Sequence, residues 1–157
     1  MAVNIFLQIP NIPGDSTTKG FANQFELMSY SWGVSNTSTN AGSGKPNFTS
    51  LNVMTFGGSH APSLMLATAA GTRVGTLVLS FTTTTGTGAI SVVATYTLTN
   101  AFIQSYQESG SEGGGPPTVS MSFGYSKIDF KQYKANKDGT TTLSDDRFWD
   151  LQANKGG

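Results

Sequence analysis

Hydrophobic and polar residues alternate along most of this chain, which indicates β-strands rather than helices. In residues 3–9 every second side chain is aliphatic, until Pro10 ends the run. Similar patterns predict strands over residues 26–32, 48–56, 76–83, 90–106, 118–133 and 147–151. The pair Asp138-Gly139 predicts a tight hairpin turn before the last of them. We therefore expect a mainly β protein, a small antiparallel β-barrel with one short α-helix.

The strand predicted over residues 26–32 has two unlike faces. One face is the bulky row Met28, Tyr30 and Trp32, and the other holds Leu27, Ser29 and Ser31. Period-two geometry separates the two sets in any extended segment. We expect the bulky row to face the barrel core and the two serines to point outward.

The predicted helix covers residues 61–70, shortly before a glycine that suits its end. Pro62 fits the first helical turn, and Gly71 fits the C-terminal stop. Ala61 is a poor N-cap, so either Ser59 caps the helix or the first turn is weakly held.

Two polar segments, residues 35–46 and 107–117, are rich in Gly, Ser and Asn or in Gly and Pro, which predicts loops. Strands of similar character continue on both sides of each loop, so neither loop marks a domain boundary. The chain of 157 residues is therefore predicted to be one domain, 1–157, with enough length for a core.

Charge is scarce and unevenly placed. Charged residues make up 11% of the chain, against roughly 25% in a typical globular protein. Between residues 46 and 107 the only formal charge is Arg73. Either many hydroxyl groups simply face water, or this surface meets copies of itself, which near-zero net charge favours. The balanced charge also argues against binding to nucleic acid.

Residues that could carry chemistry are few. The chain has no cysteine and a single histidine, His60, and it contains no Gly-x-Ser-x-Gly motif. The carboxylates of Asp145, Asp146 and Asp150 fit a polar turn and strand edge better than an acid–base pair. We therefore expect no enzyme activity, no metal site and no cofactor.

The N-terminal residues show no basic region followed by a long apolar run, so no signal peptide is expected. No apolar run approaches the ~20 residues that a membrane span requires. We therefore expect no direct membrane insertion.

Several motifs occur together in this chain: the opening Met-Ala-Val, the segment Tyr30-Ser31-Trp32-Gly33, the polar loop after it, the helix segment from Ala61 to Ala67, Gly71, and the late strand from Val119 to Phe123. In this combination they resemble one known family, the haemolysin-coregulated proteins (Hcp) of type VI secretion. The chain departs from the family pattern at Gly57-Gly58-Ser59 and at Pro116-Pro117, where members often carry charge. Both departures touch expected contact regions.

The resemblance implies a small β-barrel with one helix whose copies form a hexameric ring. Rings stack into a tube that carries small effector proteins in its lumen, with a contractile sheath and a spike as further partners. The protein would assemble in the bacterial cytoplasm and be secreted without a signal peptide.

In such a ring, the outward face of one sheet must line the pore, so Ser29 and Ser31 are expected to face lumen and cargo. The expected ring-stacking residues lie on the two loops: Asn36, Thr37, Asn40, Ser43, Lys45, Glu108 and Glu112. Two alternatives stay open: a monomeric carbohydrate-binding β-sandwich, and the tube protein of a related phage-tail-like contractile particle.

Overall fold

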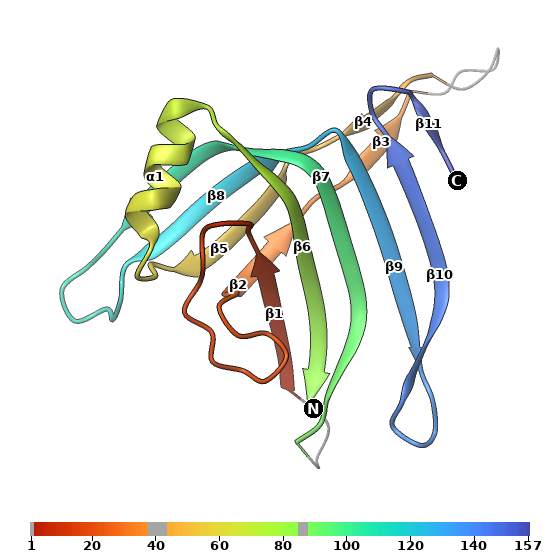
Figure 1. Cartoon of the computed structure of the whole chain (residues 1–157), viewed down its shortest axis with the longest axis horizontal. Helices are drawn as coiled ribbons and strands as arrows, with labels where there is room; N and C mark the ends of the chain where they lie inside the picture. The colour runs from red at the N-terminus through yellow and green to blue at the C-terminus, as the bar shows by residue number, and fades with distance from the viewer. Residues whose placement is uncertain (1, 38–43, 85–87) are drawn as a thin grey trace.

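A computed structural model describes residues 2–37, 44–84 and 88–157 of the chain. Six antiparallel strands of these residues close into a barrel (Figure 1). In spatial order they are β7 (Ile90–Ser109), β6 (Arg73–Thr84), β1 (Ala2–Gln8), β2 (Phe25–Ser31), β5 (Leu51–Phe56) and β8 (Thr118–Gly124). β8 pairs back onto β7 and closes the barrel. The predicted mainly β, antiparallel barrel is confirmed.

β7 is the longest strand and changes partners along its length. Its N-terminal part pairs with β9 (Lys127–Ala135), from Ala94 to Thr99. Its C-terminal part pairs with β8 instead. Between the two parts lies Asn100, whose left-handed φ of 58° interrupts the regular extended backbone. One strand can therefore belong both to the closed barrel and to a sheet that leaves it.

The sheet that leaves the barrel is the C-terminal hairpin, formed by β9 and β10 (Thr141–Asp150) and extended by the short β11 (Lys155–Gly156). Gly139, with φ of 88°, occupies the turn of this hairpin, as the Asp138-Gly139 pair predicted. A separate ribbon is formed by β3 (Val34–Asn36) and β4 (Pro46–Phe48). In Figure 1 the ribbon lies at one end of the molecule, beside the end of β10.

The helix α1 (Ala61–Ala70) matches its predicted range and packs Leu64 and Ala67 against β7. Gly71 ends it in the left-handed conformation, with φ of 67°. His60 occupies the N-cap position and makes no capping hydrogen bond. Ser59 does not cap the helix either, because its N–H and Oγ both donate to Asp15 Oδ2, at 2.8 and 3.1 Å. The first turn therefore lacks a side-chain cap.

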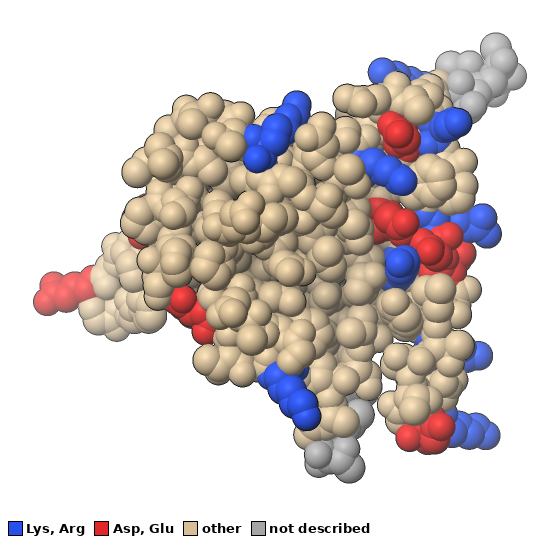
Figure 2. Space-filling view, viewed as in Figure 1, with Lys and Arg blue, Asp and Glu red and all other residues tan. Residues whose placement is uncertain are grey.

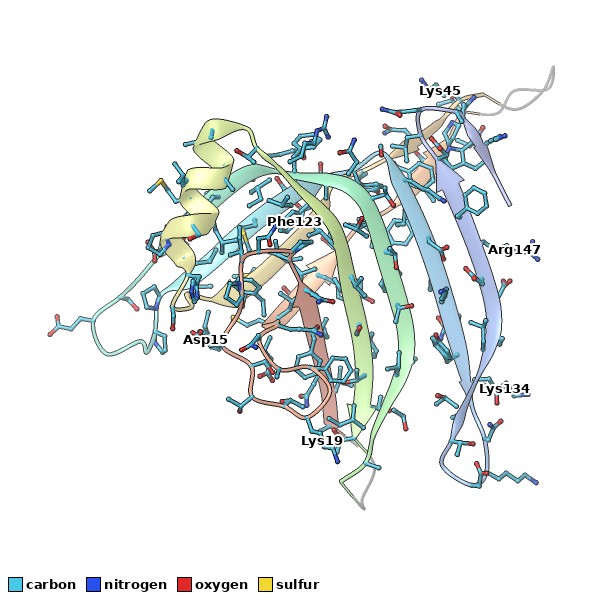
Figure 3. The ribbon with its side chains drawn as sticks, viewed as in Figure 1. Asp15, Lys19, Lys45, Phe123, Lys134 and Arg147 are labelled. Atoms are coloured by element: carbon cyan, nitrogen blue, oxygen red, sulfur yellow. The ribbon has the colours of Figure 1, made fainter. Side chains whose placement is uncertain are left out.

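The core fills the barrel with aliphatic and aromatic side chains from every barrel strand. Its most deeply buried members include Leu7, Leu51, Leu77, Leu79, Leu98 and Phe123, each at most 1% exposed. Figure 3 shows Phe123 within the barrel. On the outside of β1, the segment before β2 covers Phe6, whose ring stacks on Phe21 with centroids 4.4 Å apart.

Two predicted strands are each divided in the structure. Residues 48–56 form the end of β4 and then β5, with a break where the Thr49 N–H donates to the Gly33 carbonyl. Residues 118–133 form β8 and most of β9, separated at Tyr125 and Ser126. The sequence carries a sign of this second break that the prediction missed: Ser126 and Lys127 are consecutive polar residues, so the alternation changes phase between Tyr125 and Ile128. The last strand also begins earlier than predicted, at Thr141.

The predicted bulky row of β2 is wrong at its first position. Met28 is 48% exposed, whereas Leu27 is buried in the core. The cause is a β-bulge: Leu27 pairs with Thr55 and Ser29 with Met54, so the extra residue Met28 shifts the alternation. After the bulge Tyr30 packs against the core as predicted.

Candidate functional site

The outer face of four neighbouring strands forms a surface of small polar side chains. We call it the polar wall and define it by seven residues: Ser29 and Ser31 on β2, Asn52 on β5, Ser105 and Gln107 on β7, and Ser120 and Ser122 on β8. All except Ser120 and Ser122 are exposed, and these two are half-buried.

Strand register arranges the polar wall in levels, each of which is a row of paired residues that runs across the strands. Ser31 pairs with Asn52, Asn52 with Ser122, and Ser122 with Ser105. The Ser105 and Ser122 hydroxyls are hydrogen bonded at 2.6 Å. At the next level, Ser120 pairs with Gln107 on β7. The surface is therefore continuous across all four strands.

Two β-bulges orient this surface. The bulge at Met28 leaves Ser29 and Ser31 on the outer face while Tyr30 turns inward. A second bulge on β7, between Ile103 and Ser105, turns Ser105 outward opposite Ser122. Without these extra residues, simple alternation would send Ser29 and Ser31 to the same side as Leu27.

A shallow hollow of about 490 Å³ lies over the polar wall. Its lining includes six of the seven wall residues together with Met54. The polar wall itself carries no formal charge. Beneath it, the Tyr30 and Tyr96 hydroxyls are 3.2 Å apart. Burial, and then the hydrogen bond to Tyr30, raises the pKa of Tyr96 well above its ordinary value, so the buried phenol is neutral at physiological pH.

The expected ring-stacking residues occupy two opposite ends of the molecule. Asn36, Thr37 and Lys45 are near the tip of the β3–β4 ribbon, whereas Glu112 lies in the connection between β7 and β8 (Figures 1 and 3). Asn36 exchanges hydrogen bonds with the backbone of Gly44, at 2.9 and 3.1 Å. Asn40 and Ser43 lie outside the described residues.

The predicted loop over residues 107–117 is shorter than expected. β7 continues to Ser109, so Glu108 lies on the strand and only Glu112 lies in the connection. The predicted loop over residues 35–46 likewise has paired ends, because Asn36 and Pro46 pair across the ribbon. Both glutamates are exposed.

Residues that could support catalysis are dispersed. His60 is exposed at the start of α1, far along the chain from the aspartates of β10. The described ranges contain no group of three or more His, Cys, Asp or Glu side chains able to hold a metal ion. No helix in the same ranges has the length and apolar character needed to cross a membrane.

The two tryptophans pack within an aromatic cluster rather than presenting flat exposed faces. Trp32 contacts Tyr96 and Phe130 edge-on, with centroids 5.8 and 6.1 Å apart. Trp149 stacks on Phe48 at 6.4 Å. An exposed aromatic platform of the kind that binds sugar rings is therefore not formed by these two side chains.

The sequence interpretation found only two of the seven residues of the polar wall. Asn52, Ser120 and Ser122 could have been found from alternation within their strands, because each stands between core residues. Ser105 and Gln107 could not, since the bulge at Gln104 reverses the alternation before them.

The geometry thus defines a class: a small antiparallel barrel with one uncharged, hydrogen-bonding outer sheet face. Comparison with known proteins identifies the family. The family model "Type VI secretion system effector, Hcp" matches residues 6–132. A search of curated protein sequences found no match.

Solved structures share the fold over almost the whole chain. A structure titled "Structure of a type six secretion system protein" has a TM-score of 0.91 and 23% identity, covering 99% of this chain and 100% of its own. Hcp1 from Salmonella typhimurium has a TM-score of 0.79 and 22% identity, with 100% of both chains covered. A type VI secretion system effector from Yersinia pestis has a TM-score of 0.71 and 14% identity, covering 93% of this chain and 98% of its own.

The chain belongs to the Hcp family, since the family model covers most of its length. It is a tube protein of type VI secretion. Hcp proteins are structural and secreted, and the family points to assembly as a homo-oligomeric ring.

Proposed function

We propose that this chain closes into a hexameric ring whose lumen is lined by the polar wall, and that rings stack into a tube carrying small effector proteins. The sheath and the spike of a contractile machine are the other partners. The protein assembles in the bacterial cytoplasm and leaves the cell without a signal peptide. The tube itself performs no catalysis.

The observation that carries this proposal is the neutral polar wall. Six of its side chains lie around one hollow and present hydroxyl and amide groups. Such groups form weak, exchangeable hydrogen bonds with a passing protein, whereas rows of strong charge would bind some cargoes tightly and repel others. A surface of this kind suits a conduit that must hold cargo and release it.

The charges at the two ends of the molecule support head-to-tail stacking. Lys45 lies at the ribbon end (Figure 3). Glu108 lies near the C-terminal end of β7 and Glu112 in the connection from β7 to β8, which Figure 1 shows at the opposite end of the molecule. A ring that presents cations on one rim and carboxylates on the other attracts the next ring in one orientation only. Contacts between exposed charges are weak and sensitive to salt, so stacking in dilute solution should be weak.

The lumen assignment is tested by Ser31→Gln, which adds bulk to the polar wall. We expect the variant to keep the ring, as measured by analytical ultracentrifugation, and to lose protection of a co-expressed cargo protein. The matched control is Ser63→Gln, an exposed serine on α1, which should change neither property. A large loss of barrel stability in Ser31→Gln with unchanged cargo binding would show that Ser31 is a packing residue instead.

The stacking assignment is tested by charge reversal. Lys45→Glu should leave rings intact and reduce tube formation, seen by electron microscopy, because like charges would then face each other. Glu112→Lys in the same chain should restore tubes if the two residues meet across rings. Loss of the rings themselves in Lys45→Glu would place the ribbon at the lateral contact between subunits.

A further inference from the structure

Three large apolar side chains interrupt the outer sheet face that carries the polar wall. They are Met28, Met54 and Phe56, which are 48, 38 and 48% exposed. We call this group the apolar band. Single exposed apolar side chains are common, but three on one sheet face form a patch, and apolar patches are often binding surfaces.

Strand register places the apolar band beside the polar wall. Met54 pairs with Ser29 on one side and with Ser120 on the other. Phe56 is two residues further along β5, so its side chain leaves the same face of the sheet. Met28 is the extra residue of the β2 bulge, next to Ser29, and its exposure shows that it also points outward.

The outer face therefore changes character along the strands. The level of Ser31 and Asn52 contains only hydroxyl and amide groups. The next level replaces one polar group with Met54, and the level after that holds Phe56 beside Thr118. Further along β2 the exposed Glu26 marks the end of the uncharged region.

Resting on the lumen assignment above, we propose that the apolar band is a binding site for apolar side chains of polypeptide cargo. Methionine is unbranched and polarizable, so it adapts to differently shaped apolar groups. Methionine-rich surfaces bind varied partners for this reason. Closure of the ring repeats the band around one level of the lumen, where several weak contacts act together.

The size of the apolar band favours a transient cargo over a second copy as its occupant. Three side chains about half exposed offer on the order of 300 Å² of apolar surface at most, if each is given the upper end of the roughly 150–250 Å² of an aromatic side chain. A stable interface buries about 800 Å² on each partner. The polar levels beside the apolar band add little affinity for apolar cargo. An apolar cargo segment is therefore held at the level of the band and not at the other levels.

Peptide binding to intact rings tests this inference. The probes are two fluorescein-labelled peptides of equal length and net charge, one with spaced leucines and the other with serines at those positions. By fluorescence anisotropy the leucine peptide should bind more tightly to the unmodified protein. In Met28→Gln/Met54→Gln its affinity should fall about tenfold, while that of the serine peptide stays unchanged. Phe56→Gln, made separately, should weaken the leucine peptide in the same direction.

A matched control removes the same number of exposed apolar side chains elsewhere. Met65→Gln/Leu143→Gln changes α1 and the C-terminal hairpin, where these side chains are 51 and 49% exposed. It should leave the affinity for both peptides unchanged. Equal binding of the two peptides by the unmodified protein, or unchanged binding in both band variants, would overturn the inference. Loss of tube growth with unchanged peptide binding would instead make the band a contact between copies, which also overturns it.

The lumen assignment can be tested separately by thiol labelling, because the chain contains no cysteine and an introduced one is therefore the only thiol. Ser120→Cys supplies a single thiol on the polar wall, and Ser63→Cys supplies one on α1. In rings, a bulky maleimide polymer should label Ser120→Cys more slowly than Ser63→Cys, while a small maleimide labels both. Equal labelling by the bulky reagent would overturn the lumen assignment. A shielded thiol with no peptide preference would overturn the apolar band alone.

Discussion

The barrel and the C-terminal hairpin are built from the same kind of alternating strand, yet their surfaces differ strongly in charge. Residues 2–124, which include the barrel, carry seven charged side chains, whereas residues 127–155 carry eleven. In Figure 2 the charges gather over β9 and β10, and the surface over the barrel and α1 is nearly free of them. Lys134 and Arg147 lie on the hairpin, away from the barrel (Figure 3).

Topology explains the difference. The barrel closes, so its strands pair on both sides and need no charge to prevent unwanted pairing. β10 has β9 along its whole length on one side, and only the two residues of β11 on the other. A strand with an open edge invites pairing with other chains unless charged side chains discourage it. The exposed Asp145, Asp146 and Arg147 are suited to that role.

The largest expected difference between the two regions lies in leucine truncation. Leu79 is fully buried between β1 and β7, so Leu79→Ala should lower the free energy of unfolding by about 2–5 kcal/mol. Leu143 on β10 is 49% exposed, and Leu143→Ala should change that free energy by only about 0.5 kcal/mol. Denaturant unfolding at one fixed protein concentration measures both, because assembly makes stability depend on concentration. Equal losses of unfolding free energy would mean that the hairpin around Leu143 is packed in the assembled ring as tightly as the barrel core.

A smaller difference is expected for glycine substitution. A methyl group on Gly14 would meet the backbone of Gln24 and Phe25, which cannot move without disturbing β2. Gly139 has open space around it, so only its positive φ disfavours a side chain there. Gly14→Ala should therefore cost about 1–3 kcal/mol, and Gly139→Ala about 1 kcal/mol through backbone strain. Thermal unfolding of the two variants measures which substitution costs more stability. A larger cost for Gly139→Ala would show that the segment before β2 moves easily to accommodate the methyl group on residue 14.

The smallest expected effect is a pH dependence confined to the hairpin. Burial, and then the hydrogen bond and negative charge of Asp146, raise the pKa of Asp129 above its ordinary value. Lys127 and Lys131 oppose this shift. The folded protein therefore holds the Asp129 proton to higher pH than the unfolded chain, so stability falls as pH rises through that window. Asp129→Asn should flatten the fall, measured as the melting temperature against pH.

Asp138 in the hairpin turn is the control of opposite sign. Hydrogen bonds from the Thr140 hydroxyl and N–H, at 2.6 and 3.0 Å, lower the pKa of Asp138. Its contribution to stability is present above the unfolded pKa and is lost as pH falls. Asp138→Asn should therefore matter at neutral pH and not in acid. The same trend in both variants would mean that the response is not local to these carboxyl groups.

Local features of the sequence determined much of this protein. Alternation predicted the strands because it depends only on neighbours within each strand, and Pro62 and Gly71 bounded the helix for equally local reasons. Asp138-Gly139 placed the hairpin turn through the conformational freedom of glycine. The scarcity of charge and the combined motifs were enough to indicate the family. Ser29 and Ser31 were correctly placed on the outer face of β2.

Only the tertiary structure decided how these strands combine. The bulges at Met28 and before Ser105 arise from pairing with β5 and β8, which lie far away in the sequence. They exposed Met28, buried Leu27 and brought Ser105 to Ser122. The change of partner along β7 divided one predicted strand into β8 and β9. A strand pattern specifies which side chains alternate, but the partner strand specifies where an extra residue is accommodated, and that choice depends on long-range packing.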